Sequence, residues 1–270
     1  MAFSEIARRG LVMLGCGKMG SAMLEGWLER DLPPASVHVI DPNPSDWLRV
    51  QGVSLNGTMP ENPAVVLLAV KPQMMAEALP RVAAFGGGGT LFVSVAAGTP
   101  IATFEAALGE GTRVVRAMPN TPAAIGQGIT AIVGNAAAGP DDLALAEALL
   151  SAVGHVVRLD AEDQIDAVTG VSGSGPAYVF HMIDAMAEAG VAEGLPPELA
   201  MALAKATVAG AGALAMSADE TPEQLRINVT SPNGTTQAGL EVLMDDATGL
   251  SPLIRRTVAA AARRSRELRG

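Results

Sequence analysis

Residues 11–20 read LVMLGCGKMG, and this stretch decides the fold. Four apolar residues predict a buried strand, and the glycines that follow have the G-x-G-x-x-G spacing of a turn into a helix. The first glycine permits a tight turn, the second lets a pyrophosphate approach the backbone, and the third allows close packing of helix on strand. The helix N-terminus then presents its amides to phosphate groups. We therefore predict a dinucleotide-binding loop whose cofactor contacts come from Gly15, Cys16, Gly17, Lys18, Met19 and Gly20.

Short apolar runs alternate with Ala- and Leu-rich amphipathic stretches from residue 11 to about residue 158. Several runs are apolar on both faces, which is typical of a parallel sheet covered by helices on each side. Such alternation predicts a Rossmann-type doubly wound α/β domain. The expected strands are Leu11–Leu14, Val37–Ile40, Val65–Val70, Leu91–Val95, Val114–Met118, Ile129–Val133 and His155–Leu159. The expected helices between them include Gly17–Glu29, Gln73–Ala84, Pro100–Leu108 and Asp141–Ala152.

After about residue 160 the pattern becomes helical, so we expect a dinucleotide-binding domain at 1–160 and an all-helical domain at 161–270. Leu199–Met216 is apolar nearly all round, and a helix of this kind must be buried on most of its circumference. The helical half has little interior in which to bury it, so we expect a subunit interface there. The alternative is a central helix within one compact domain. A terminal helix is expected over Ser251–Gly270.

The composition excludes several classes of protein. The chain has 270 residues, 49% of them hydrophobic, and a formal net charge of −10, which argues against a broad nucleic-acid surface. A single cysteine suits a reducing compartment, and with three scattered histidines it offers no metal site. The longest strongly apolar stretch, Ala64–Val70, is far short of the roughly 20 residues of a spanning helix. The run before Cys16 is also too short for a lipoprotein signal. We expect a cytoplasmic protein that binds neither nucleic acid nor membrane.

Asp41 bears on the choice of nicotinamide cofactor. It ends the second expected strand, where a carboxylate can accept hydrogen bonds from the adenosine ribose and would repel a 2′-phosphate. Asn43 and the prolines beside it bring no cation that would bind that phosphate. The sequence therefore favours NADH over NADPH, with Asp41 and Asn43 beside the cofactor. The alternative is that Asp41 only caps the next helix.

Further candidate residues follow the carboxyl ends of the other parallel strands, where ligands bind to sheets of this kind. Lys71 is one of only three lysines, and it follows the strand that ends at Val70. A solvated Lys71 is the alternative. The segments at these strand ends are Ala69–Pro72, Ser94–Gly98 and Met118–Pro122.

Two motifs of the helical half are more specific than the glycine loop: VSGSGPAY at residues 171–178 and SPNGTT at residues 231–236. With the segments above, in the same order, they closely resemble the pyrroline-5-carboxylate reductase family over residues 11–268. The resemblance implies an oxidoreductase that reduces Δ1-pyrroline-5-carboxylate to L-proline with NAD(P)H, the last step of proline biosynthesis. It also implies a Rossmann domain followed by helices that interlock with a second subunit in a homodimer, and a larger ring such as a decamer.

The resemblance further implies roles for individual residues. Thr236 matches the threonine that hydrogen-bonds the ring nitrogen, and it is the expected catalytic residue. Asn233 stands where the family usually has glycine, but asparagine tolerates a positive φ. The expected substrate contacts are Asn228, Ser231, Gly234, Thr235 and Thr236. The expected cofactor contacts outside the glycine loop and Asp41 are Ala69, Val70, Lys71, Pro72, Ala97 and Asn120.

A cyclic imine would suit this set of residues. Its nitrogen can be protonated before hydride arrives, so the protein does not need a proton donor of tuned pKa. Hydroxyls and amides of residues 231–236 can orient the ring and bind its carboxylate. The alternative for this segment is a plain turn with a helix cap. Two other functions compete: a β-hydroxyacid dehydrogenase that uses Lys205, and a scaffold that binds NAD(P)H without turnover.

Overall fold

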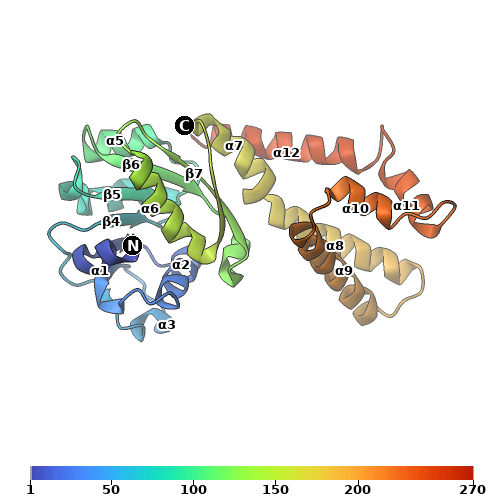
Figure 1. The fold of residues 1–270 in the computed structure, drawn as a ribbon, viewed down its shortest axis with the longest axis horizontal. Coiled ribbons are helices and arrows are strands. Elements are labelled where there is room, and N and C mark those ends of the chain that lie inside the picture. The colour runs from blue at the N-terminus through green and yellow to red at the C-terminus, as the bar shows by residue number, and fades with distance from the viewer. Residues whose placement is uncertain (1, 270) are drawn as a thin grey trace. The chain divides into compact units, whose positions relative to one another are not determined.

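The structure, a computed structural model, describes residues 2–269. They form two compact units (Figure 1), one of residues 2–173 with 262–269 and the other of residues 174–261. These units do not divide at residue 160, because residues 161–173 and the end of the last helix pack on the first unit. The expected terminal helix is α12, Leu250–Glu267, and Gly270 lies outside the described residues.

The first unit is built on an eight-stranded sheet in the order β3-β2-β1-β4-β5-β6-β7-β8. From β3 to β6 the strands are parallel and follow the Rossmann order, as predicted. Every expected strand is present, and β3 is an additional strand that is too short to give a sequence pattern. The strands are β1 (Leu11–Leu14), β2 (Val37–Ile40), β3 (Ser54–Leu55), β4 (Val65–Leu68), β5 (Leu91–Ser94), β6 (Arg113–Met118), β7 (Gly128–Gly134) and β8 (Gly154–Arg158).

The expectation of a parallel sheet is wrong at one position, since β7 runs antiparallel to β6. The cause is the length of the connection. Residues 119–127 hold only a 3₁₀ turn, Thr121–Ile125, and a parallel crossover needs roughly a dozen residues or more. The chain therefore turns back on itself after β6, and β8 then pairs parallel with β7.

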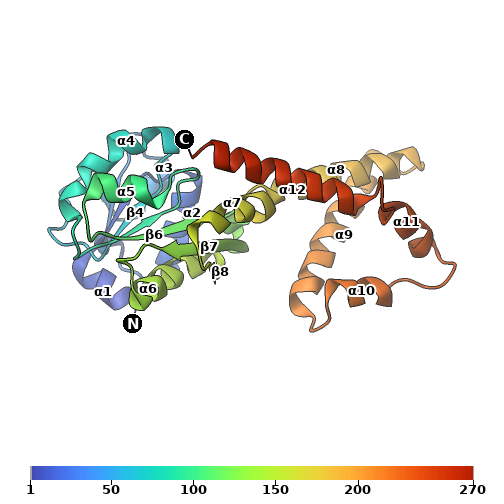
Figure 2. The same ribbon diagram turned by 90° about the horizontal axis from the view of Figure 1, so that it is seen from above.

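Helices cover both faces of the sheet and give it two separate cores. Along β4 the side chains of Val65 and Leu67 enter one core and those of Val66 and Leu68 enter the other. Figure 2 shows α4 and α5 on one side of the sheet and α1 and α6 on the other. The first core includes residues of α1 (Ala2–Arg9), α2 (Lys18–Leu28), α3 (Asp46–Arg49) and α6 (Pro140–Leu150). The second includes residues of α4 (Met75–Ala78), α5 (Ile101–Leu108) and α7 (Ile165–Val168).

The expected helix Gln73–Ala84 is broken in the structure, which is a second correction. Only α4 is α-helical there, and 3₁₀ turns precede and follow it. Pro80 lies in the middle of the expected helix, where it removes a backbone donor and clashes with the preceding turn. The 3₁₀ turns of the first unit are Pro34–Ser36, Pro72–Met74, Leu79–Arg81, Ala83–Phe85, Thr121–Ile125, Ser151–Val153 and Glu162–Gln164, and Thr169–Gly173 is π-helical.

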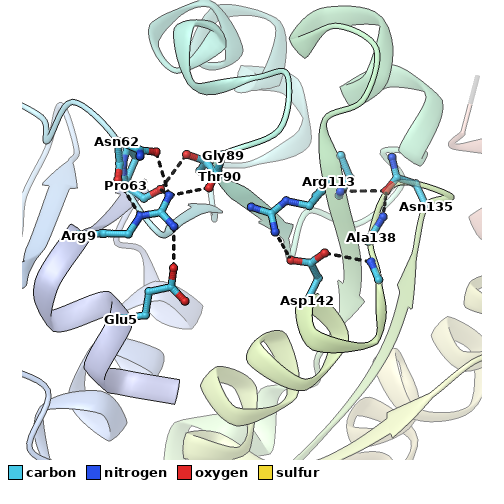
Figure 3. A network of polar contacts seen from close by, with 12 residues as sticks. Glu5, Arg9, Asn62, Pro63, Gly89, Thr90, Arg113, Asn135, Ala138 and Asp142 are labelled. Atoms are coloured by element: carbon cyan, nitrogen blue, oxygen red, sulfur yellow. Dashed lines mark hydrogen bonds and ion pairs between the residues drawn. The ribbon is translucent and has the colours of Figure 1, made fainter. Parts of the chain in front are cut away.

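The amino-terminal edge of the sheet is fastened by Arg9 at the end of α1 (Figure 3). Its guanidinium donates to Glu5 at 2.7 Å, to the side chain of Asn62 at 2.9 Å and to the carbonyls of Pro63 at 3.0 Å and Gly89 at 2.5 Å. One side chain thus joins α1 to the segments that enter β4 and β5. The glycine loop lies at the opposite, carboxyl edge of these strands, after β1.

The second unit is helical, as predicted. Its helices α8 and α9 pack against each other around Ala187, Ala200 and Ala204 (Figure 1). Many larger apolar side chains of this unit stay exposed, among them Leu203 and Leu214 of α9. The helices are α8 (Gly175–Ala192), α9 (Pro197–Ser217), α10 (Pro222–Asn228), α11 (Thr235–Leu243) and the start of α12.

Helix α9 is unusually long and apolar for a helix that is exposed in one chain. Among the described residues it is the one helix long and apolar enough to cross a membrane by length and composition alone, so the expectation that Ala64–Val70 is the longest apolar stretch is wrong. Only 11% of its apolar window is buried within one chain. A helix that is covered by a second subunit has the same length and composition as a membrane-spanning helix. These two properties of α9 therefore fit a subunit interface as well as a membrane span.

Candidate active site

The glycine loop has the geometry that its spacing predicts. Gly15 turns with φ of +82°, and a Cβ there would lie 3.1 Å from the Ala69 carbonyl oxygen. A Cβ on Gly20 would lie 2.9 Å from the Gly15 carbonyl oxygen, so helix and strand touch through backbone. At Gly17, by contrast, a Cβ would meet no atom within 4 Å. The loop is therefore tightly packed against the protein at Gly15 and Gly20, and it has free space at its middle glycine, Gly17.

The open side of this loop has the backbone chemistry that favours a negatively charged group. Gly17 is the N-cap of α2 and has no side chain to occupy the free amides of the first turn. Lys18 is exposed at the first helical position, and α2 has no acidic residue in its first turn. Amides, helix dipole and lysine all favour a negatively charged group here.

Asp41 holds the glycine loop in shape. Its carboxylate accepts the Cys16 amide at 2.7 Å and the Asn43 amide at 2.8 Å. Asn56 in turn accepts the Asp41 amide and donates to the Asp41 carbonyl. The alternative that Asp41 caps the next helix is wrong, because Ser45 caps α3 by accepting the Leu48 amide at 3.2 Å. Sequence reasoning missed Asn56, since nothing in the sequence pairs residues that are so far apart.

Cys16 points into the protein and not toward the open side of the loop. Its side chain belongs to the core of the first unit. Burial raises the pKa of the Cys16 thiol, and its contact with the Ser21 hydroxyl lowers that pKa by less. The thiol is therefore protonated at neutral pH and is a poor nucleophile.

The other strand ends meet the glycine loop at one edge of the sheet. The parallel register aligns Leu14 with Leu68 and Leu68 with Ser94, so the residues after β1, β4 and β5 emerge side by side. Ala69 and Val70 are half-buried there, whereas Lys71, Pro72 and Ala97 are exposed. The Asn120 side chain accepts the Ile129 amide at 2.9 Å and so fixes the turn after β6.

The residues expected to bind substrate lie in the second unit, around the start of α11. Ser231, Thr235 and Thr236 are exposed, and within residues 2–269 their hydroxyls have no hydrogen-bond partner. Gly234 is the N-cap of α11 and brings no side chain to cap the helix, so the turn does end in a helix cap, as in the alternative. Asn228 ends α10, where its side chain accepts from Gln224 at 2.8 Å. The expected left-handed conformation of Asn233 is confirmed by its φ of +60°.

Gly234 lies close to Ser231, so that a larger residue there would force the Ser231 side chain to move. A Cβ there would collide with the Ser231 side chain, and the Gly234 amide donates to the Ser231 carbonyl at 3.0 Å. The Asn233 amide donates to the Gln237 side chain at 2.8 Å. The turn is thereby closed without its three hydroxyls, which remain available to a ligand.

Both the dinucleotide-binding part and the helical part of the chain match known protein families. Residues 10–98 match the model of the NADP oxidoreductase coenzyme F420-dependent family, and residues 162–268 match that of pyrroline-5-carboxylate reductase dimerisation. With its glycine loop on a Rossmann sheet, the chain is an oxidoreductase of the NAD(P)-dependent class.

Whole-chain relatives identify the family. The chain is 40% identical over 264 residues to pyrroline-5-carboxylate reductase of Pseudomonas aeruginosa, with 96% of each protein covered. It is 41% identical over 265 residues to the Synechocystis enzyme of that name, covering 96% of this chain and 97% of the relative. The chain belongs to the pyrroline-5-carboxylate reductase family.

Solved structures agree with this family. A pyrroline-5-carboxylate reductase from Coxiella burnetii superposes with a TM-score of 0.91 at 33% identity, covering 97% of this chain and 99% of that one. A Plasmodium falciparum pyrroline carboxylate reductase with NADP bound gives a TM-score of 0.82 at 25% identity, covering 97% and 98%. The β-hydroxyacid dehydrogenase and the non-enzymatic scaffold are therefore set aside, and Lys205 has no assigned role.

Proposed function

We propose which residues carry out the reaction of this family in this chain. As a family member, the chain reduces Δ1-pyrroline-5-carboxylate to L-proline by hydride transfer from NAD(P)H, in proline biosynthesis. The observation that carries this conclusion is the identity over nearly the whole length of relatives with that name. The proposed division of labour has residues 1–160 bind the dinucleotide and residues 161–270 supply the substrate loop and the subunit contacts.

The direct test follows absorbance at 340 nm with the purified chain. We expect NADH and NADPH each to be oxidised when Δ1-pyrroline-5-carboxylate is added, and L-proline to form in equal amount. A 2-hydroxy or 3-hydroxy acid with oxidised cofactor serves as the control and should give no signal. Absence of oxidation with both cofactors would contradict the proposal.

The dinucleotide would lie along the carboxyl edge of the sheet. Open space at Gly17 and the first-turn amides of α2 support a pyrophosphate there. The exposed residues after β4 and β5, Lys71 and Ala97, would line the same edge. The bound cofactor supplies the hydride. The remaining proposed contacts are Gly15, Cys16, Lys18, Met19, Gly20, Asp41, Asn43, Ala69, Val70, Pro72 and Asn120.

The substrate would bind at the 231–236 turn. Its carboxylate would accept from the amides at the start of α11 and from the Ser231 and Thr235 hydroxyls, and the helix dipole favours that charge. The Thr236 hydroxyl would hydrogen-bond the ring nitrogen and so fix the face of the ring that receives hydride. Asn228, whose side chain is bonded to Gln224, would support the turn from α10. The ring nitrogen arrives protonated, and no further proton is needed before proline forms.

We further propose that the chain prefers NADH over NADPH, because the Asp41 carboxylate would repel a 2′-phosphate. Asp41→Ser should shift the ratio of kcat/KM toward NADPH by about tenfold, equivalent to about 1.4 kcal/mol. Because Asp41 also accepts the Cys16 and Asn43 amides, Asp41→Asn is the closer variant: it loses the charge and keeps one of the two acceptor oxygens. If the charge selects the cofactor, both variants shift the ratio. An unchanged ratio in Asp41→Asn would rule out charge as the selector.

The dimerisation model that matches residues 162–268 supports an oligomer, and we propose that α9 is buried between subunits. Leu203→Glu should then yield a smaller species by light scattering at micromolar concentration, because a buried unpaired carboxylate is costly. Val50→Glu, at an exposed apolar side chain of the first unit, is the control and should leave the mass unchanged. A folded monomer of the unaltered chain would contradict the proposal. We further propose closed rings of dimers such as a decamer, which the measured mass tests directly.

Burial of α9 between subunits would also account for its apolar composition without a membrane. We therefore propose a cytoplasmic enzyme, and its net charge of −10 supports the absence of nucleic acid among its partners. Sedimentation of the chain with lipid vesicles would contradict the first statement, and retention on DNA at physiological salt the second.

A further inference from the structure

A buried carboxylate outside the candidate site holds the end of α12. Asp166 of α7 is 1% exposed, and the Ser265 hydroxyl donates to one of its oxygens at 2.7 Å. The Arg269 guanidinium pairs with the other oxygen. A buried carboxylate is costly unless its charge is paired and its oxygens accept hydrogen bonds. Asp166 meets both conditions through residues of a single segment, 265–269.

The segment held in this way lies against a loop of the candidate dinucleotide edge. A Cβ added to Gly98 would lie 3.5 Å from the Leu268 carbonyl oxygen, so the two residues are close neighbours. Gly98 has φ of +74° and directly follows Ala97, in the loop after β5. Residue 268 therefore lies beside the middle of that loop.

The far end of the same loop is fixed by another acidic residue of the segment before α7. Glu162 accepts the Ile101 amide at 2.8 Å, where the loop enters α5. Glu162 also pairs at 2.5 Å with Arg116, a β6 residue that is 2% exposed. Residues 162–166 thus fix the loop after β5 at one end directly and at its middle through the end of α12.

We propose that Asp166 is a positioning residue for dinucleotide binding: through Arg269 and Ser265 it keeps Leu268 against Gly98 and so pre-orders the loop that carries Ala97. A loop that is already ordered loses less conformational freedom when the ligand binds, and the affinity is higher for that reason. This rests on the proposed function only in placing the dinucleotide beside the loop after β5.

The test measures the Kd for NADH and for NADPH by calorimetry, without substrate. Arg269→Ala, and a variant that ends at Glu267, should each raise both Kd values about tenfold. Arg269→Lys keeps the charge and should stay within about threefold of the unaltered chain. The matched control is Arg264→Ala on the same helix, which removes an exposed pair with Glu267 that does not involve Asp166, and it should leave both Kd values unchanged. Arg269→Ala leaves the buried Asp166 carboxylate with only the Ser265 hydroxyl, so the melting temperature should fall as well, and less in Arg269→Lys.

The same variants separate positioning from general damage. At saturating dinucleotide, the KM for Δ1-pyrroline-5-carboxylate should be unchanged, because the 231–236 turn lies in the other unit. Unchanged Kd values in Arg269→Ala would overturn the proposal, as would an equal loss of substrate and dinucleotide affinity. If the chain did not reduce Δ1-pyrroline-5-carboxylate, the turnover assay would fail while the Kd values could still be measured, because calorimetry needs no turnover. The two failures are therefore distinguishable.

Discussion

Gly17→Val is expected to abolish dinucleotide binding and leave the fold intact. A Cβ at this position would meet no protein atom within 4 Å, and the φ of −73° is one that valine adopts readily. A pyrophosphate needs this open space to reach the amides of α2. The methyl groups of valine would therefore block the ligand without colliding with the rest of the protein. We expect the Kd for NAD(P)H to rise by more than about a hundredfold, which corresponds to about 2.7 kcal/mol.

Its control is the neighbouring glycine of the same loop. Gly15→Ala should lower the melting temperature, because φ of +82° strains any other residue and the Cβ would press on the Ala69 carbonyl. Calorimetry gives the Kd of Gly17→Val and thermal unfolding gives the stability of both variants. Retained binding in Gly17→Val would remove the dinucleotide from this loop. A large loss of stability in the same variant would mean that the space is needed by the protein itself.

The second large effect is expected at Thr236. Its hydroxyl is exposed and has no hydrogen-bond partner within the described residues, so its removal should not change stability. If its oxygen accepts from the protonated ring nitrogen and so orients the ring, Thr236→Val should lower kcat/KM for Δ1-pyrroline-5-carboxylate about a hundredfold, as for loss of one positioned hydrogen-bonding group in an active site. The Kd for NAD(P)H should stay the same.

Thr236→Ser is the matched variant, because it keeps the hydroxyl and loses only a methyl group. It should retain activity within about tenfold of the unaltered enzyme. Full activity in Thr236→Val would exclude the hydroxyl from the reaction. A crystal structure with dinucleotide and L-proline, in which the 231–236 turn is far from the nicotinamide in every pairing of subunits, would exclude the whole turn.

The sequence by itself determined the Rossmann strands, the glycine loop and the turn at 231–236. Each depends on neighbouring residues: an apolar run long enough for a strand, glycines at fixed spacing, an asparagine that accepts the left-handed conformation at position 233. Local conformation follows from local chemistry, and these expectations hold within one or two residues.

The tertiary structure alone decided which distant residues meet. The direction of β7 relative to β6 depended on the short connection between them. The hydrogen-bond partners of Asp41, Arg9 and Asp166 come from distant segments, and no sequence pattern links those segments to them. Such contacts form because a buried charge or amide must find a partner wherever the packed chain offers one. The sequence states that a carboxylate stands at position 166, and only the fold shows that it holds the end of α12.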